Sequence, residues 1–426
     1  MYIVFIIILL LREFFWLLPI DLVVLPDVIR ISDAGLLLMF IVVVYAIGTN
    51  SRRITYLKSS FTPVIIGFVV LSLLNIYISN INYEQPFSLG FRAIRANFFY
   101  LLFFAVILTI DNRKKLNRFI RWIMILCFIL TGFTVLQFAV PGLHIFHTDN
   151  AGIFEKRFGM SRFINPGLDM VAFACFIAIA RFIQSGTSCG LSCMITGAIF
   201  SLQIMLSQTR AYLLSFPAAM MISMTVTGKF RWLMITSWCF VMGSGTFILL
   251  GQVNPNMSSN FLTKLYESSY SETMSQHGTV GQRFAQAQSF WKIGMEHPVN
   301  GSGVISPLGK AAIRLNYPVF RTDLGYVIMF SQYGILGIAW LVWLSLVYFR
   351  KVRHIYRLNT DSALKALVLA LMTHYVFMVI SFVTLPHFIL GAMIVTVVLN
   401  LAILEVVHRL AAESAEQVEG IVYAAS

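Results

Sequence analysis

Apolar stretches of about 15 to 25 residues recur from one end of the chain to the other, with short polar connections between them. A stretch of this length crosses a hydrocarbon layer of roughly 30 Å as a helix that satisfies its own backbone hydrogen bonds. The pattern therefore predicts an all-α integral membrane protein with about twelve transmembrane helices. The expected spans are residues 1–19, 34–48, 60–80, 96–110, 119–140, 168–184, 189–208, 211–226, 232–251, 324–349, 363–384 and 387–406.

One polar stretch, residues 252–323, is much longer than the other connections. Within it, Phe284, Ala287 and Trp291 follow the i, i+3, i+7 spacing of one helical face, which predicts a helix over residues 280–295. We expect a single polytopic domain over residues 1–426. In that domain 252–323 is a large, partly helical loop between spans 9 and 10, and 141–167 is a smaller loop.

The composition agrees with a membrane protein. Hydrophobic residues make up 58% of the 426 residues and charged residues only 12%, whereas soluble domains contain about 25% charged residues. The mean hydropathy is +0.81. The first apolar segment has no basic start and no small-residue cleavage site, so we expect a retained helix rather than a removable signal peptide.

Lysine and arginine gather in alternate short loops, and this asymmetry predicts the orientation. In a twelve-span arrangement the basic loops all fall on one side, which is then cytoplasmic and contains both termini. Those loops hold Arg52, Arg53, Lys58, Arg113, Lys114, Lys115, Arg118, Lys229, Arg231, Arg350, Lys351, Arg353 and Arg357. The 252–323 and 141–167 loops are then expected on the opposite, extracytoplasmic side. The formal charge of +13 is mostly explained by topology and lipid headgroups, and we expect no nucleic-acid partner.

Several arginines lie on the opposite, outer side. Arg210 sits in a tight turn between two spans, where it either reaches lipid headgroups or faces a cavity and binds phosphate. Arg283 lies on the predicted loop helix, as a solvated residue or as a second anion ligand. Arg321 and Asp323 stand where the chain re-enters the membrane, either as a structural ion pair or as a functional pair. Arginine suits phosphate because its planar fork donates two hydrogen bonds and keeps its charge.

Four groups of residues, in this order, are similar to motifs of the O-antigen ligase and polymerase family. They are Arg157-Phe158-Gly159 with Phe163-Ile164-Asn165-Pro166 and Ala172; Ser207-Gln208-Thr209-Arg210-Ala211; Arg283 through Trp291 to His297-Pro298-Val299-Asn300-Gly301-Ser302-Gly303; and Tyr326 to Tyr333-Gly334-Ile335-Leu336-Gly337. The resemblance covers residues from about 150 to 340, the central part of the chain.

The resemblance implies a GT-C-like membrane glycosyltransferase of the bacterial inner membrane, with its active site facing the periplasm. Such enzymes move a glycan from undecaprenyl diphosphate to an acceptor sugar hydroxyl in the assembly of O-antigen, lipopolysaccharide or exopolysaccharide, and no metal or other cofactor is expected. The family's turn arginine corresponds to Arg210 and its loop-helix arginine to Arg283. With Arg321, these residues are expected to bind the donor diphosphate. Candidate further substrate contacts are Arg157, Arg162, Arg314 and Tyr326.

One departure from the family pattern bears on the reaction. O-antigen ligases commonly carry a histidine before the re-entering span, and the corresponding residue here is Asp323. An acid at that position favours a polysaccharide polymerase, in which Asp323 acts as general base or orients the acceptor. The expected partners are the lipid-linked donor, a saccharide acceptor, membrane lipids and a chain-length regulator. The alternatives are a ligase acting on lipid A core or a protein, and a transporter of lipid-linked saccharides.

Overall fold

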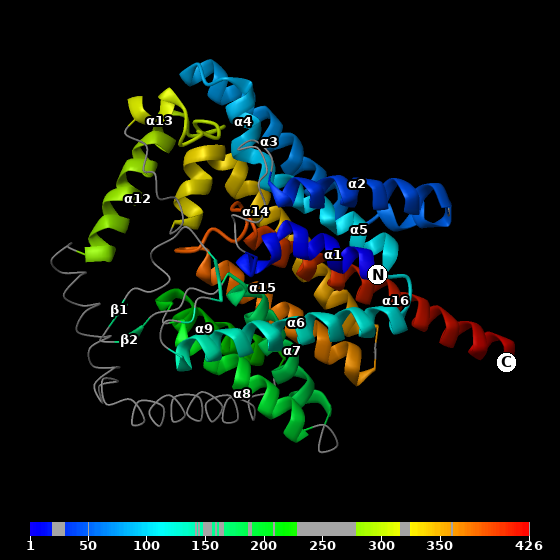
Figure 1. Ribbon diagram of the computed structural model, residues 1–426. Helices are drawn as coiled ribbons and strands as arrows, with labels where there is room; N and C mark the ends of the chain where they lie inside the picture. The colour runs from blue at the N-terminus through cyan, green and yellow to red at the C-terminus, as the bar shows by residue number, and fades with distance from the viewer. Residues whose placement is uncertain are drawn as a thin grey trace.

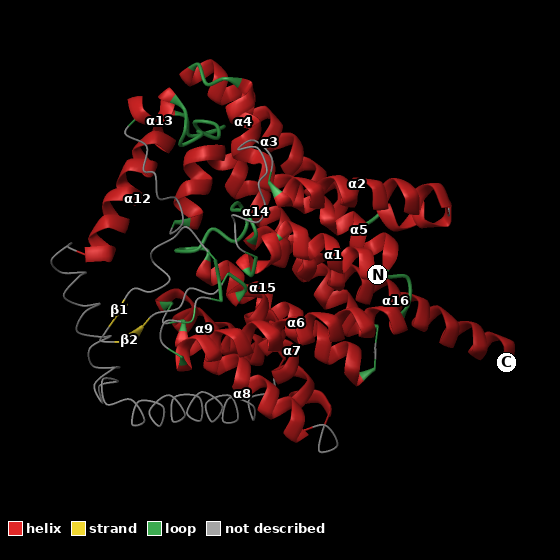
Figure 2. Ribbon diagram, in the orientation of Figure 1, coloured by secondary structure: helices red, strands yellow, loops and turns green. Residues whose placement is uncertain are grey.

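The computed structural model describes residues 1–18, 30–49, 51–140, 143, 145–147, 156–157, 160–161, 166–185, 190–207, 209–227, 278–315, 324–358 and 361–425. Nearly all of these residues are helical, and the two strands are two residues long each (Figure 2). The α-helices before the strands are α1 (Tyr2–Leu11), α2 (Ile31–Thr49), α3 (Phe61–Tyr83), α4 (Phe87–Ile94), α5 (Leu102–Thr109) and α6 (Arg113–Ala139). Three 3-10 helices accompany them: η1 (Glu13–Trp16), η3 (Ser51–Leu57) and η4 (Arg95–Leu101).

The antiparallel strands β1 (Lys156–Arg157) and β2 (Met160–Ser161) follow α6. The remaining helices are α7 (Leu168–Ser185), α8 (Gly190–Leu206), α9 (Arg210–Thr227), α12 (Gly278–Glu296), α13 (Lys310–Arg314), α14 (Gly325–Arg357), α15 (Ser362–Ser381) and α16 (Met393–Ala425).

The predicted membrane class is confirmed. Seven helices in the described part of the chain are long and apolar enough to cross a membrane: Ile31–Thr49, Phe61–Tyr83, Phe87–Thr109, Arg113–Gln137, Gly325–Arg357, Ser362–Ser381 and Met393–Ala415. Helices overlap eleven of the twelve ranges expected from the sequence, and the other, 232–251, lies outside the described residues. The total of twelve spans stays a prediction.

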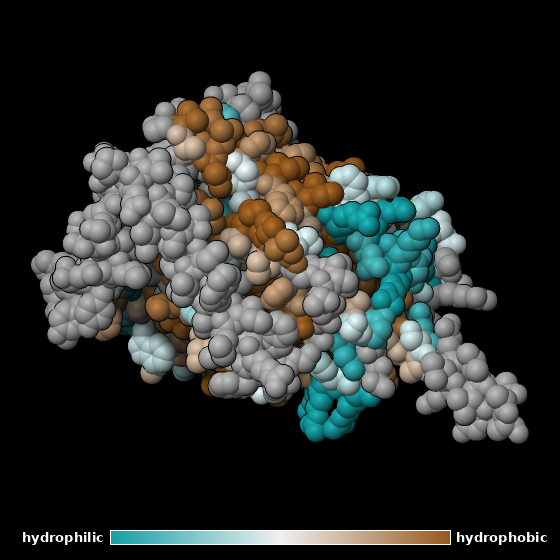
Figure 3. Space-filling model, turned by 90° about the horizontal axis from the view of Figure 1, so that it is seen from below, coloured by the Kyte–Doolittle hydropathy of each residue, from teal (hydrophilic) through white to brown (hydrophobic). Residues whose placement is uncertain are grey.

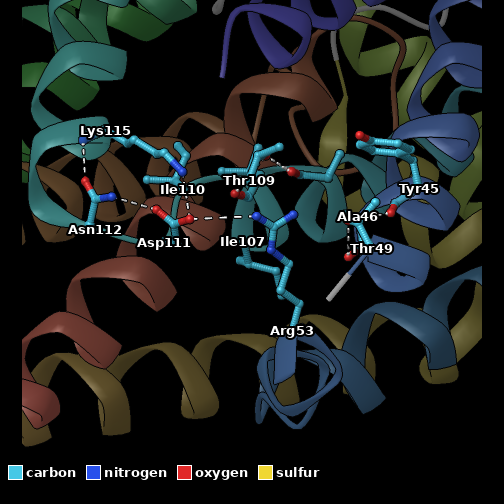
Figure 4. A network of polar contacts seen from close by, with 12 residues as sticks. Tyr45, Ala46, Thr49, Arg53, Ile107, Thr109, Ile110, Asp111, Asn112 and Lys115 are labelled. Carbon is cyan, nitrogen blue, oxygen red and sulfur yellow. Dashed lines mark hydrogen bonds and ion pairs between the residues drawn. The ribbon is translucent and has the colours of Figure 1, made fainter. Parts of the chain in front are cut away.

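One end of the bundle gathers the loops that the sequence predicts to be cytoplasmic. Asp111, between α5 and α6, lies 3.8 Å from the Arg53 guanidinium and 2.7 Å from Lys115 Nζ (Figure 4). Arg113, at the start of α6, pairs with Asp361 before α15. Both chain termini lie at this end in Figure 1. Three of the predicted cytoplasmic loops therefore share one side, as the charge pattern requires.

The surface has the polarity that a membrane position requires. Seen from below, hydrophilic residues gather at the end where the termini lie, and hydrophobic residues form a broad area beside them (Figure 3). Large apolar side chains on α2 and α3 are more than half exposed, among them Phe40, Tyr45 and Tyr77. Exposure of so many large apolar side chains to water is unfavourable, which indicates that this surface contacts lipid.

The opposite end holds the residues of the predicted outer loops. His147 N–H donates to the Trp16 carbonyl at 2.7 Å, and Gln85 bonds to the Val304 carbonyl. In Figure 1, α12 lies at this end and runs steeply across the direction of α1, α6 and α16. The described part of the 252–323 loop is thus partly helical, as predicted, with α12 and α13 as its helices.

Candidate functional site

Helix α14 is broken in its N-terminal third, at Gly334. This residue has φ +61° and ψ −152°, a conformation that is essentially restricted to glycine. A Cβ at Gly334 would lie 2.5 Å from the carbonyl carbon of Val299. The break therefore needs glycine twice, for its backbone conformation and for the close approach of the 297–306 segment.

The 297–306 segment satisfies the backbone groups that the break leaves open. Ser302 N–H donates to the Ser331 carbonyl at 2.8 Å and Gly303 N–H to the Gln332 carbonyl at 3.1 Å. In return, Ile335 N–H donates to the Pro298 carbonyl at 2.9 Å. Irregular backbone inside a membrane protein requires such partners, because lipid offers none. Two of the family-like motifs, 297–303 and 333–337, are therefore one packed unit.

The segment is also fixed to the first half of the bundle. Gln85 accepts from Ser306 N–H at 2.7 Å through Oε1 and donates to the Val304 carbonyl at 2.9 Å through Nε2. Gly303, at φ +82°, approaches α3 so closely that a Cβ would lie 2.6 Å from Ser79 N. The 297–306 segment is thus held between α3, α4 and α14.

Helix α12 presents Arg283 to the bundle. Arg283, Ala287, Phe290 and Gly294 follow the i, i+4, i+7, i+11 spacing of one helical stripe. Phe290 is fully buried, and a Cβ at Gly294 would lie 2.8 Å from the Phe330 ring on α14. Arg283 is half-buried on this stripe and is not a residue of the outward face.

The helix expected over residues 280–295 is present as α12, and its most deeply buried residues differ from those of the apolar pattern that predicted it. Phe284 and Trp291 are 62% and 53% exposed, although Trp291 stacks on Phe330 with ring centroids 4.9 Å apart. The packed face instead contains Phe290 and Ile293. Both faces of α12 carry apolar residues, so the i, i+3, i+7 spacing alone did not identify the one that faces the protein.

Arg210 is the first residue of α9, and the structure gives its backbone position only. Two residues later, the Tyr212 ring is buried and stacks on His387, with centroids 6.0 Å apart and an interplanar angle of 11°. His387 belongs to the connection between α15 and α16. The turn that carries Arg210 therefore rests on this connection.

His387 is a residue that the sequence motifs did not indicate. It is fully buried, and neither ring nitrogen has a hydrogen-bond partner among the described residues. Burial lowers its pKa to about 4, against the opposing influence of Asp169, so the ring is neutral at neutral pH. A lone histidine next to a proline in an apolar segment gives no sequence signal for this position.

A buried ion pair lies beside that connection. Arg12 and Asp169 form two hydrogen bonds of 2.7 Å each, and both residues are almost completely buried. Arg12 also donates to the carbonyls of Ala392 at 2.6 Å and Pro166 at 2.5 Å, and Thr396 donates to Asp169 at 2.5 Å. The pair thus joins the end of α1, the start of α7 and the start of α16.

Of the other predicted site residues, the structure places only some. Asp323, Arg321 and Arg162 lie outside the described residues, and for Arg157 in β1 and Arg314 in α13 the structure gives the backbone position only. Tyr326, at the start of α14, donates its hydroxyl to the Val379 carbonyl at 2.8 Å and packs on Phe382. The assembly of these side chains into one site therefore stays a prediction.

Beneath the docked loop lies a small polar cavity of about 30 Å³. Asn97, Gln332 and Tyr333 contribute polar atoms to it, and Val304, Ile389 and Leu390 contribute apolar ones. Asn97 donates to the Tyr333 hydroxyl at 2.7 Å. Among the described residues, no three His, Cys, Asp or Glu side chains come together as metal ligands would; metal-independent chemistry stays a prediction.

Part of the chain is similar to a known protein family. Residues 195–342 match the family described as O-antigen ligase, a range that runs from α8 to the middle of α14 and includes Arg210 and Arg283. This match confirms the family predicted from the sequence motifs. No curated protein sequence matches the chain.

Proposed function

The chain carries the O-antigen ligase domain over residues 195–342, and from this premise we propose that it is a polymerase of a bacterial surface polysaccharide. The donor is a glycan carried on undecaprenyl diphosphate, and the acceptor is a sugar hydroxyl of another lipid-linked repeat unit. Transfer takes place at the outer face of the inner membrane, with both termini in the cytoplasm. A chain-length regulator is the protein partner that this activity would require.

The observation that carries the proposal is the direction of Arg283. It lies half-buried on the stripe of α12 that packs against α14, within a loop whose following segment is fixed in the break at Gly334. An arginine held at the outer end of a membrane bundle suits an anionic group at the level of lipid headgroups. A solvated position on the outward face would have argued against such a role.

In the proposed reaction, the acceptor hydroxyl oxygen bonds to the anomeric carbon of the donor sugar as the bond from that carbon to the diphosphate oxygen breaks. Undecaprenyl diphosphate leaves with the electron pair, and the hydroxyl proton passes to Asp323. Arg210 and Arg283, assisted by Arg321, stabilise the negative charge that grows on the diphosphate. Arg157, Arg162, Arg314 and Tyr326 are proposed as further contacts to substrate. Donors of this kind contribute about 3–4 kcal/mol each to transition-state stabilisation.

A ligase is the second candidate, because the matched family is described by that activity. Purified protein incubated with lipid-linked repeat units alone separates the two functions. A polymerase extends them into a ladder, whereas a ligase forms product only when lipid A core or a protein acceptor is added. A ladder that requires no second acceptor is the expected result, and product that depends on lipid A core would overturn the proposal.

The role of Asp323 has its own test. Asp323→Asn removes the proposed proton acceptor at nearly constant size, so we expect chain extension to fall strongly while binding of the lipid-linked donor persists. An active Asp323→Asn protein with an unchanged pH profile would exclude Asp323 as the base and leave the arginine assignments standing.

A further inference from the structure

A groove with two arginines in its lining runs along α4 and η4. Its volume is about 470 Å³, and its lining consists of Ser88, Leu89, Phe91, Arg92, Arg95 and Phe98. Ligand pockets commonly enclose about 300–1,000 Å³. The described lining residues combine apolar and aromatic side chains with two arginines, and none of these described residues is a carboxylate.

The position of α4 explains why these side chains line an open groove. Gly90 is buried against α3, where a Cβ would lie 2.5 Å from Ile76 Cγ2, and Ile94 is buried on the same side. This close packing turns Phe87 and Phe91 outward, and they are 48% and 50% exposed. The groove therefore results from the close packing of α4 on α3 at Gly90, which leaves the phenylalanines on the other side of α4 exposed.

The groove lies at the start of a candidate membrane span. Helix α4 forms the first part of the candidate span Phe87–Thr109. Gln85, two residues before this helix, is hydrogen-bonded to the backbone of Val304 and Ser306. Arg92 and Arg95 thus stand within the first turns of a membrane-spanning stretch. Arginines at such a depth are costly and usually mark a binding function or an interface with lipid phosphate.

The two arginines are three residues apart, so they lie on one side of the helix. Arg95 is oriented by Asp33 of α2, which accepts a 2.8 Å hydrogen bond from Nη1, and both side chains keep some solvent access. Asp33 itself lies outside the described groove lining. The groove keeps a basic character and fits an anion with an apolar chain attached.

We propose that the α4 groove binds the diphosphate and the first isoprene units of a second polyprenyl diphosphate lipid. The guanidinium groups of Arg92 and Arg95 hold the diphosphate, and Phe91, Phe98 and Leu89 contact the prenyl chain. This inference rests on the proposed polymerase function, in which donor and acceptor are both lipid-linked. The groove is then the acceptor's lipid site, and Arg210 and Arg283 serve the donor.

Binding stoichiometry tests the inference without relying on catalysis. The full-length protein in detergent micelles is titrated with undecaprenyl diphosphate, and the number of lipids per chain is read by native mass spectrometry. Wild type is expected to bind two, Arg92→Gln one, and Arg283→Gln one. The matched control is Arg118→Gln, which removes an exposed arginine on α6 at the other end of the bundle and should leave two bound.

Each outcome decides between the two proposals. Two lipids on Arg92→Gln, or a single lipid on wild type that only Arg283→Gln removes, would overturn the groove assignment. Two lipids on Arg283→Gln and one on Arg92→Gln would instead overturn the donor role of Arg283. Displacement of the groove lipid by an equal concentration of phosphatidylglycerol would show a general phospholipid site and contradict the assignment. Should Arg92→Gln fail to fold, Arg92→Lys is expected to bind the second lipid about tenfold more weakly, because lysine lacks the planar fork.

Discussion

At the scale of single residues, the ion pair between Arg12 and Asp169 is the most demanding feature of the bundle. Both side chains are withdrawn from solvent, with residue exposures of 3% and 4%. The free-energy cost of desolvating two charges is offset only when the two groups pair with good geometry and their remaining polar atoms form hydrogen bonds. The carbonyls of Pro166 and Ala392 and the hydroxyl of Thr396 meet that requirement for most of the polar atoms.

Removing one member of this pair is expected to destabilise the protein by about 3–5 kcal/mol, because the other charge stays buried without its partner. We therefore predict a lower thermal midpoint for Arg12→Met and for Asp169→Leu in the same detergent. The double variant should recover a large part of the loss. Arg118→Met, at an exposed site, is the control and should behave as wild type. Additive losses in the double variant would mean that the two side chains do not depend on each other.

The sequence indicated some of the residues discussed above as candidates and gave no sign of others, and the difference has a physical reason. Arg210 and Arg283 could be selected because a charge at a span end or on a loop helix contrasts with its apolar surroundings. The pairing of Arg12 with Asp169 joins positions 157 apart in the chain, and single-sequence periodicity contains no information on such contacts. His387 was invisible for the same reason, since its burial depends on Tyr212 from another helix.

At the scale of elements, three glycines allow the 297–306 segment to pack closely against α14 and α3. Gly301, Gly303 and Gly334 all have positive φ, and a Cβ at each would lie within 2.3 to 2.6 Å of a backbone atom of a neighbouring segment. The loop motif and the span motif are consequently required together. Their co-occurrence in the sequence indicated the family, and the structure shows their packing as the physical cause.

Gly334→Ala is expected to release the 297–306 segment from the break in α14. The new methyl group would meet Val299 and impose an unfavourable backbone conformation, which costs on the order of 1–3 kcal/mol before the clash is counted. The segment should become more sensitive to limited proteolysis and the thermal midpoint should fall. Gly132→Ala on α6, where a Cβ meets nothing within 4 Å, is the control and should be neutral or slightly stabilising. Equal behaviour of the two variants would contradict this account of the break.

The sequence predicted the presence of the loop helix, and it made no prediction of which face of that helix packs on the bundle. The 280–295 helix was expected and is present as α12, yet its packed face contains Phe290 and not Phe284. Length and hydropathy identify helices in a membrane protein because lipid offers no hydrogen-bond partners, so the backbone of a spanning segment must bond to itself as a helix. Which apolar face meets protein and which meets lipid is decided by partners such as Phe330, which the local pattern cannot reveal.

At the scale of the whole molecule, the bundle has two ends with different chemistry. The end with both termini joins basic loops through Asp111 and Asp361, and the other end carries α12, the docked loop, the Arg210 turn and the α4 groove. This division follows from the charge asymmetry of the sequence. The assignment of the second end to the periplasm completes the proposal that a glycan is transferred there.

The most direct test of the central claim compares two cations on the same helix. Arg283 lies on the face of α12 that packs against α14, and Lys292 is exposed on another face. With lipid-linked repeat units as the only glycan, we predict that Arg283→Gln lowers the rate of chain extension by about 100-fold or more, the loss of one charged donor to a growing oxyanion. Lys292→Gln should extend chains at the wild-type rate. Near-wild-type ladders from well-folded Arg283→Gln protein would contradict the account.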